Sequence, residues 1–206
     1  MVNVSIDGRE TAVPTGTTIL ETARGLGVTI PTLCHHEHLS PYGGCRVCLV
    51  EVAPASAPER ARLMPACITH VEEGTTVRTD TPRVVQARTF VVLLLLSRSP
   101  DAPPLQELAR SLGVLPAEGS PPGRLADYLL QRAQRSEDTR CIRCGLCVRA
   151  CAEVPQRHAI SFEGRGMKRR VVSPFRKVAE TCIGCGSCAF VCPTHTITIE
   201  EAAPAR

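Results

Sequence analysis

The feature that most constrains this chain is the distribution of its cysteines. The sequence has 206 residues and 12 cysteines, which fall into three sets of four with none left over. The sets are Cys34, Cys45, Cys48 and Cys67; Cys141, Cys144, Cys147 and Cys151; and Cys182, Cys185, Cys188 and Cys192. The second and third sets share the spacing C-x2-C-x2-C-x3-C, and Pro193 follows the last cysteine. Such a chain is predicted to fold around what its thiols bind.

Three kinds of site compete for the second and third sets. Disulfides need an oxidising compartment, and the N-terminus lacks the basic flank and apolar stretch of a secretory signal peptide. Structural zinc typically uses C-x2-C pairs separated by a dozen or more residues, whereas here the third and fourth cysteines follow at once. Bacterial two-cluster proteins use this spacing, and the fourth cysteine of each run ligates the other cluster. We therefore expect two [4Fe–4S] clusters, one on Cys141, Cys144, Cys147 and Cys192, and the other on Cys182, Cys185, Cys188 and Cys151.

The first set has a different spacing, C-x10-C-x2-C-x18-C. Its first gap is longer than that of plant-type ferredoxins, C-x4-C-x2-C. A long loop that closes on a close pair, with a distant fourth ligand, indicates a [2Fe–2S] cluster, and zinc remains an alternative for this segment. Three histidines flank Cys34, but four thiols complete the ligand set, so we expect the histidines at the rim.

The segments around the first set follow the order of a β-grasp fold. In chain order we expect a strand over 2–6, a turn at Asp7-Gly8, a strand over 11–13, a helix capped by Thr17 or Thr18 and ended by Gly25 and Gly27, a strand over 47–52 and a closing edge strand over 71–79. The Pro- and Ala-rich segment 53–62 is expected to form a surface loop.

Helices are predicted between the first and second cysteine sets. We expect them over 81–97, 105–112 and 124–135, with six prolines breaking the chain between residues 100 and 122. Short strands are expected over 159–162 and 171–172. The fold class is therefore α+β: a β-grasp [2Fe–2S] domain (1–80), a helical connector (81–136) and a bacterial-type 2[4Fe–4S] ferredoxin domain (137–206).

The composition of the chain and the motifs that it lacks exclude several classes of function. The chain has six aromatic residues and no Trp, so it lacks the stacking platforms of a nucleic-acid-binding protein. Its longest apolar run covers residues 90–96, against roughly 20 residues for a membrane-spanning helix. No catalytic triad, paired catalytic carboxylates, Walker loop or dinucleotide glycine fingerprint is present. We expect a soluble, cytoplasmic protein with no catalytic site of its own.

Taken together, the motifs resemble a known iron–sulfur module. The run Cys34-x10-Cys45-x2-Cys48, then Pro65-Ala66-Cys67, a Leu-rich helix and Cys141-Ile-Arg-Cys-Gly-Leu-Cys147 resembles the N-terminal region of complex I's large peripheral subunit. A similar module occurs in the diaphorase small subunit of NAD-reducing hydrogenases, in iron-only hydrogenases and in NAD-linked formate dehydrogenases. The resemblance covers roughly residues 1–97 and 137–200. It implies electron transfer between a flavin-containing NAD(P)H-oxidising subunit and a catalytic metal subunit of the hydrogenase or formate dehydrogenase type.

The sequence departs from this family after the Leu-rich helix. Family members usually carry H-x3-C-x2-C-x5-C there, which binds a further [4Fe–4S] cluster. The matching positions are Arg98, Ala102, Leu105 and Ser111, and none is a good iron ligand. The connector is therefore expected to be free of a cluster. Two alternatives to a fixed electron-transfer subunit stay open, a metal-bound structural or regulatory adaptor and a diffusing ferredoxin-like carrier.

Overall fold

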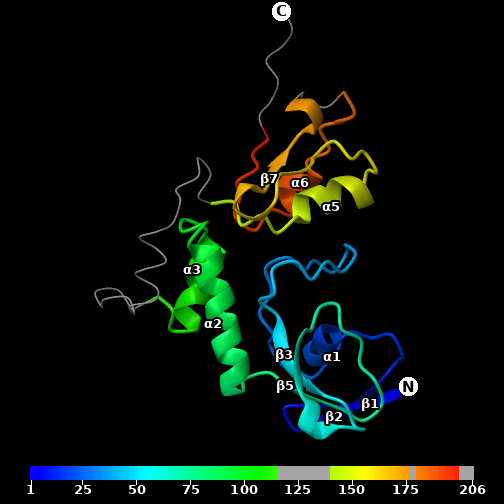
Figure 1. Cartoon of the computed structure of the whole chain (residues 1–206). Coiled ribbons are helices and arrows are strands. Elements are labelled where there is room, and N and C mark those ends of the chain that lie inside the picture. Colours follow the sequence, from blue (N-terminus) through cyan, green and yellow to red (C-terminus); the bar gives the residue numbers. More distant parts are fainter. Residues whose placement is uncertain (116–139, 177–179, 200–206) are drawn as a thin grey trace, which may run out of the picture.

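The computed structural model describes residues 1–115, 140–176 and 180–199. The N-terminal part is a five-stranded mixed sheet with one helix against it (Figure 1). Its elements are β1 (Val2–Ile6), β2 (Arg9–Val13), α1 (Ile19–Gly25), β3 (Leu49–Ala53), β4 (Arg62–Pro65) and β5 (Thr75–Arg78). The strand order is β2-β1-β5-β3-β4, and only the β1–β5 pair is parallel.

This sheet confirms the predicted hairpin, helix and third strand and corrects two other expectations. The segment 71–79 was expected at the edge, but β5 lies in the centre, between β1 and β3. A parallel partner for β1 needs a long crossover, and the chain from α1 to residue 74 supplies one. The segment 53–62 was expected to be a loop. It contains a short 3-10 helix (Pro58–Arg60) and leads into β4, a strand that the sequence analysis missed.

Helix α1 is held on the sheet by its cap and its apolar face. The Thr18 side chain accepts a hydrogen bond from the Glu21 N–H, and the Glu21 carboxylate accepts from the Thr18 N–H, which completes a capping box. Ile19, Leu20 and Ala23 are buried in one apolar cluster with the inward-facing residues of the sheet. The N-terminal part thus has a hydrophobic core of its own.

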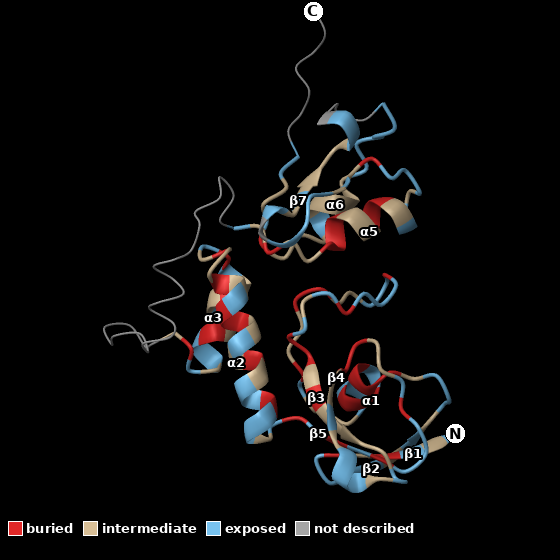
Figure 2. Cartoon of the chain, viewed as in Figure 1, coloured by how far each residue is buried: buried red, intermediate tan, exposed pale blue. Residues whose placement is uncertain are grey.

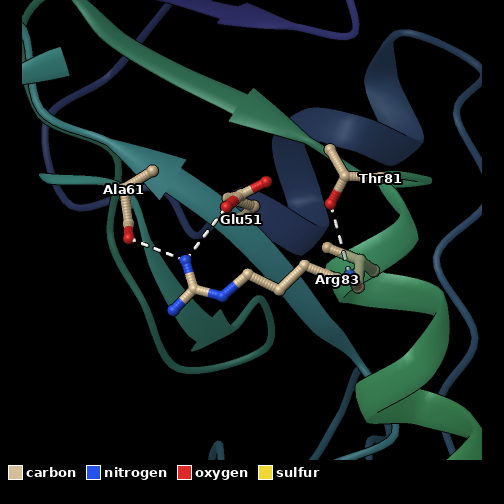
Figure 3. Close-up of polar contacts among 5 residues, drawn as sticks. Glu51, Ala61, Thr81 and Arg83 are labelled. Carbon is tan, nitrogen blue, oxygen red and sulfur yellow. Dashed lines mark hydrogen bonds and ion pairs between the residues drawn. The ribbon is translucent and has the colours of Figure 1, made fainter. Parts of the chain in front are cut away.

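The connector contains α2 (Pro82–Leu96) and α3 (Pro103–Ser111), close to the two predicted helices. Thr81 caps α2 by accepting a hydrogen bond from the Val84 N–H, and Arg83 Nη1 donates to Glu51 Oε1 at 3.1 Å and to the Ala61 carbonyl at 3.0 Å (Figure 3). The buried Arg88 guanidinium donates twice to the Leu49 carbonyl. The bonds of Arg83 and Arg88 to Glu51 and Leu49 attach α2 to strand β3.

The C-terminal part is a small region with little sheet. It contains α5 (Leu146–Glu153), β6 (Ser161–Glu163), β7 (Arg170–Val172) and α6 (Ser187–Phe190), with 3-10 helices at Gly166–Lys168 and Pro174–Arg176. The hairpin of β6 and β7 confirms the two predicted strands. The helix predicted over 124–135 lies outside the described residues.

The segment between α1 and β3 extends from the sheet toward α5 (Figure 1). Figure 2 shows buried residues in α1, along α2 and α3 and in α5, and within the sheet Val4, Ile6, Val50 and Val77 are buried. Among the described residues, no helix combines the length and apolar character needed to cross a membrane.

Candidate metal centres

The first predicted quartet, Cys34, Cys45, Cys48 and Cys67, lies together beside the sheet. Cys34 and Cys48 are each 1% exposed and Cys67 is 2% exposed. Cys48 Sγ and Cys67 Sγ share a hydrogen bond at 3.4 Å, and the Cys45 N–H donates to Cys34 Sγ at 3.4 Å. Thiols from three separate segments of the chain therefore meet in one largely buried place.

The thiols of the first quartet perturb one another. The pKa of Cys67 is raised, first by its hydrogen bond with Cys48, then by burial and by the charges of Cys48, Cys34 and Cys45. The pKa of Cys34 is lowered, mainly because Cys45 donates to it. A positively charged centre that accepts all four thiolates would remove this mutual repulsion. The residues thus suit a cluster with soft thiolate ligands.

The second predicted quartet surrounds a cavity. Cys141, Cys144, Cys147 and Cys192 all line a space of about 170 Å³, together with apolar neighbours that include Ile142, Val171 and Ile197. In the sequence, Cys192 ends the run that begins at Cys182. In the structure it lines the same cavity as Cys141, Cys144 and Cys147, the first three cysteines of the preceding run. Burial raises the pKa of Cys144 to about 11 and that of Cys147 to about 12, and neighbouring thiolates add to both shifts.

The third predicted quartet is more open. Cys151 is buried, Cys188 is half-buried, and Cys182 and Cys185 are exposed. Burial raises the pKa of Cys188, and the charges of Cys151 and Cys185 raise it further. Cys182 lies exposed three residues before Cys185, on the same loop.

Each cysteine run enters its helix through a glycine in the left-handed conformation. Gly145 (φ 79°) precedes α5, and Gly186 (φ 74°) precedes α6. A Cβ atom at Gly145 would also lie only 3.1 Å from the Phe162 ring. Glycine allows the chain to turn between the second and third cysteines of each run.

Hydroxyl and amide groups approach several of these sulfur atoms. Thr194 Oγ1 lies 3.5 Å from Cys192 Sγ and 2.8 Å from Thr196 Oγ1, and Thr194 is 1% exposed. An iron-bound thiolate carries no proton, so with a cluster present Thr194 donates to Cys192 and accepts from Thr196. Sequence analysis missed Thr194, because cysteine spacing carries no information about hydroxyl groups in the next turn.

At the four positions where the family usually carries cluster ligands, the side chains of this chain pack or form hydrogen bonds with the protein itself. Ala102 and Leu105 are fully buried in an apolar cluster that also contains Leu96. Arg98 donates to the carbonyls of Gly166 and Arg169, both at 2.6 Å. The Ser111 hydroxyl donates to the Leu108 carbonyl of its own helix. The described part of the connector is thus a packed apolar support.

The first and second quartets are neighbours. Cys45 and Cys144 both pack against the apolar cluster that contains Ile142 and Val47. Arg149, two residues after Cys147 of the second quartet, donates to the Cys34 carbonyl at 2.6 Å. The β-grasp part and the C-terminal part therefore bring their metal-binding residues together.

The donor set and its surroundings suit iron–sulfur clusters. The predicted ligands are thiols throughout, and those of the second quartet line one cavity. Glycine turns, a dry shell and hydrogen bonds to sulfur are features that iron–sulfur sites use.

Comparisons with known proteins agree with this geometry. Residues 1–82 match the 2Fe-2S iron-sulfur cluster binding domain, and residues 135–199 match the 4Fe-4S dicluster domain. The chain is 34% identical over 209 residues to an NADH-quinone oxidoreductase subunit of Rhizobium meliloti (strain 1021), covering 96% of this chain and 24% of that protein. It is 35% identical over 219 residues to an NADP-reducing hydrogenase subunit of Solidesulfovibrio fructosivorans, covering 98% of this chain and 36% of that protein.

The fold also matches a solved structure. A chain of an NAD+-reducing [NiFe]-hydrogenase in the H2-reduced state superposes with a TM-score of 0.73 at 24% sequence identity, covering 94% of this chain and 85% of that chain. The present chain spans about a quarter to a third of the length of the two curated relatives described above. The chain thus combines a region that matches the 2Fe-2S iron-sulfur cluster binding domain with one that matches the 4Fe-4S dicluster domain, and over nearly its whole length it resembles part of an NADH-quinone oxidoreductase subunit and part of an NADP-reducing hydrogenase subunit.

Proposed function

We propose that this chain relays electrons within a multi-subunit oxidoreductase, between a flavin-containing NAD(P)H-oxidising subunit and a catalytic metal subunit of the hydrogenase or formate dehydrogenase type. The observation that carries the proposal is that Cys45 of the first quartet and Cys144 of the second pack against the same apolar cluster, because this puts ligands of two candidate redox sites on one common core. The names of the relatives, an NADH-quinone oxidoreductase subunit and an NADP-reducing hydrogenase subunit, support the choice of partners.

The cofactors in this proposal are one [2Fe–2S] cluster and two [4Fe–4S] clusters. Cys34, Cys45, Cys48 and Cys67 hold the first; Cys141, Cys144, Cys147 and Cys192 hold the second; and Cys182, Cys185, Cys188 and Cys151 hold the third. The cavity that Cys192 shares with Cys141, Cys144 and Cys147 supports Cys192 as their fourth ligand. The charge of Cys151 helps to raise the pKa of Cys188, which supports Cys151 as a ligand of the third cluster. When bound, the clusters supply one-electron redox chemistry.

The chain's own residues provide placement and shielding for that chemistry. Ile142, Val171 and Ile197 keep water from the second quartet, and Thr194 donates a hydrogen bond to its ligand Cys192. The proposal divides the chain into a [2Fe–2S] domain (1–80), a connector (81–136) and a 2[4Fe–4S] domain (137–206). The connector is proposed to bind no cluster, and the apolar packing of Ala102 and Leu105 at two of the family's ligand positions supports this.

We also propose that the complex works in the cytoplasm. The spacing of the twelve cysteines suits iron–sulfur clusters rather than disulfides. A chain that depends on free thiolates is best served by a reducing compartment.

The test is to purify the full chain anaerobically with its companion chains. We expect about ten irons with matching acid-labile sulfide for each chain, reversible bleaching by dithionite, and paramagnetic signals of both cluster types. The companion chains should include a flavoprotein and a metal-containing catalytic subunit.

Other results would overturn the proposal. A colourless protein that contains zinc would indicate a structural or regulatory adaptor. A protein with the full iron content that is recovered alone, and that exchanges electrons with several unrelated enzymes, would indicate a diffusing carrier.

A further inference from the structure

The N-terminal and C-terminal parts are joined by a polar contact that centres on Ser40. Glu153 Oε2 accepts a hydrogen bond from the Ser40 N–H at 2.7 Å, and Arg149 Nη1 donates to the Ser40 carbonyl. Arg149 and Glu153 stand four residues apart on α5, so they lie on the same face of the helix. One turn of α5 therefore binds both the backbone N–H and the backbone carbonyl of Ser40, a residue on the loop that carries Cys34 and Cys45.

Arg149 also contacts the ligand loop itself. Its Nη2 donates to the Cys34 carbonyl at 2.6 Å, and its guanidinium carbon lies 5.3 Å from the centre of the Tyr42 ring. The Nε atom is buried and has no hydrogen-bond partner among the described residues. The guanidinium thus forms a fork across two carbonyls, in a geometry that a lysine ammonium cannot reproduce.

The charge of Arg149 lies near ligands of both quartets. Its guanidinium donates to the backbone carbonyl of Cys34, a ligand of the first quartet. Arg149 is two residues from Cys147, which lines the cavity of the second quartet. A single cation therefore stands beside the ligands of two proposed clusters.

We propose that Arg149 is a positioning residue, which holds the first cysteine quartet in a fixed place beside the second through the Cys34 and Ser40 carbonyls. The proposal rests on the function proposed above and adds a specific determinant of the spacing between the two centres. Glu153 assists by binding the Ser40 N–H. Arg169, whose Nη2 donates to the Tyr42 hydroxyl at 2.6 Å, provides a second and independent contact.

The test compares the anaerobically purified full-length protein with three variants, Arg149→Met, Arg149→Lys and Arg170→Met. Arg170 pairs with Glu163 within the β6–β7 hairpin, so its replacement removes one charge from the same domain without touching the loop. The first measurement is amide hydrogen exchange of residues 34–45. Because hydrogen bonds from a charged donor are among the stronger ones in proteins, we expect exchange in R149M to be at least about tenfold faster than in the wild type.

The second measurement is the magnetic interaction between the reduced centres, seen as enhanced spin relaxation of the [2Fe–2S] signal. We expect this interaction to weaken in R149M, to weaken less in R149K and to match the wild type in R170M. If R149M does not fold, R149K and Glu153→Gln test the same contact with smaller changes.

The outcomes separate the two proposals. Unchanged exchange and unchanged spin relaxation in an R149M protein of full iron content would overturn the role of Arg149. A wild-type protein without iron and sulfide would overturn the proposed function, whereas the exchange measurement would still report whether Arg149 holds the loop.

Discussion

The two cysteine runs of the C-terminal part have the same spacing but different environments. The first run extends from Cys141 to Cys151 and the second from Cys182 to Cys192. In the first run, Ile142 follows the first cysteine and is 8% exposed, whereas Ile183 at the matching position of the second run is 56% exposed. Arg149 binds the N-terminal part, while its counterpart Phe190 is 85% exposed. The same local pattern therefore makes a buried internal site in one half and an open site in the other.

A third pair of matching residues, Arg143 and Gly184, shows that the first run contains backbone strain that the second run avoids. Gly184 has a φ of 67°, which glycine adopts without strain, while Arg143 at the matching position has a φ of 52°. The Arg143 side chain donates to Ser99 Oγ at 3.1 Å and to the Arg169 carbonyl at 3.0 Å. A left-handed arginine is unfavourable on its own, so these contacts with the connector and the hairpin offset the strain. The comparison teaches that spacing selects the ligands and that neighbouring elements decide their exposure.

The largest expected effect comes from removing one ligand in each run. Cys144→Ser and Cys185→Ser should each lose about four of ten irons. Because metal binding contributes folding energy, C144S should also expose α5 and loosen the contact of the C-terminal part with the connector. C185S should disturb mainly residues 180–199. Iron analysis with hydrogen exchange measures both effects, and equal damage in the two variants would break the comparison.

A smaller effect is expected from the matched isoleucines. Ile142→Ala removes a buried side chain from the apolar cluster that includes Leu105, so it should lower the free energy of unfolding of the C-terminal part by about 3 kcal/mol. Ile183→Ala should cost about 0.5 kcal/mol or less, because that side chain is largely in water. Exchange-derived stabilities of anaerobic protein with full iron content provide the measurement. Similar losses in both variants would show that the two halves are equally packed.

The smallest expected effect concerns hydroxyl groups near the sulfur atoms. Thr194→Val deletes the buried donor to Cys192 and should lower one [4Fe–4S] midpoint potential by roughly 40 mV, equivalent to about 1 kcal/mol for one electron. Ser187→Ala should shift the other potential less, since water reaches the exposed Cys185 and replaces the lost bond. Redox titration followed by paramagnetic resonance measures both shifts. Thr194→Ser keeps the hydroxyl and serves as the control, and a shift in that variant equal to the valine shift would rule out the hydrogen bond as the cause.

Much of the local structure could be predicted from the sequence. The alternation of Val2, Val4 and Ile6 predicted β1, and a cap at Thr17 or Thr18 predicted the start of α1, which the structure places at Thr18. Both predictions succeed because strand pairing in a hairpin and helix capping depend on residues a few positions apart. The connector helices α2 and α3 were likewise found from their apolar pattern and prolines. The missed strand β4 has no such pattern, since its pairing with β3 is what orders it.

By itself, the sequence determined the local elements and grouped the cysteines, since short-range spacing limits which thiols can share a centre. Only the tertiary structure decided that β5 lies in the centre of the sheet and that Arg149 reaches the Cys34 loop. Each of these contacts joins residues that are distant in the sequence, whose meeting depends on how whole elements pack. For that reason the same cysteine spacing can produce one buried site and one exposed site.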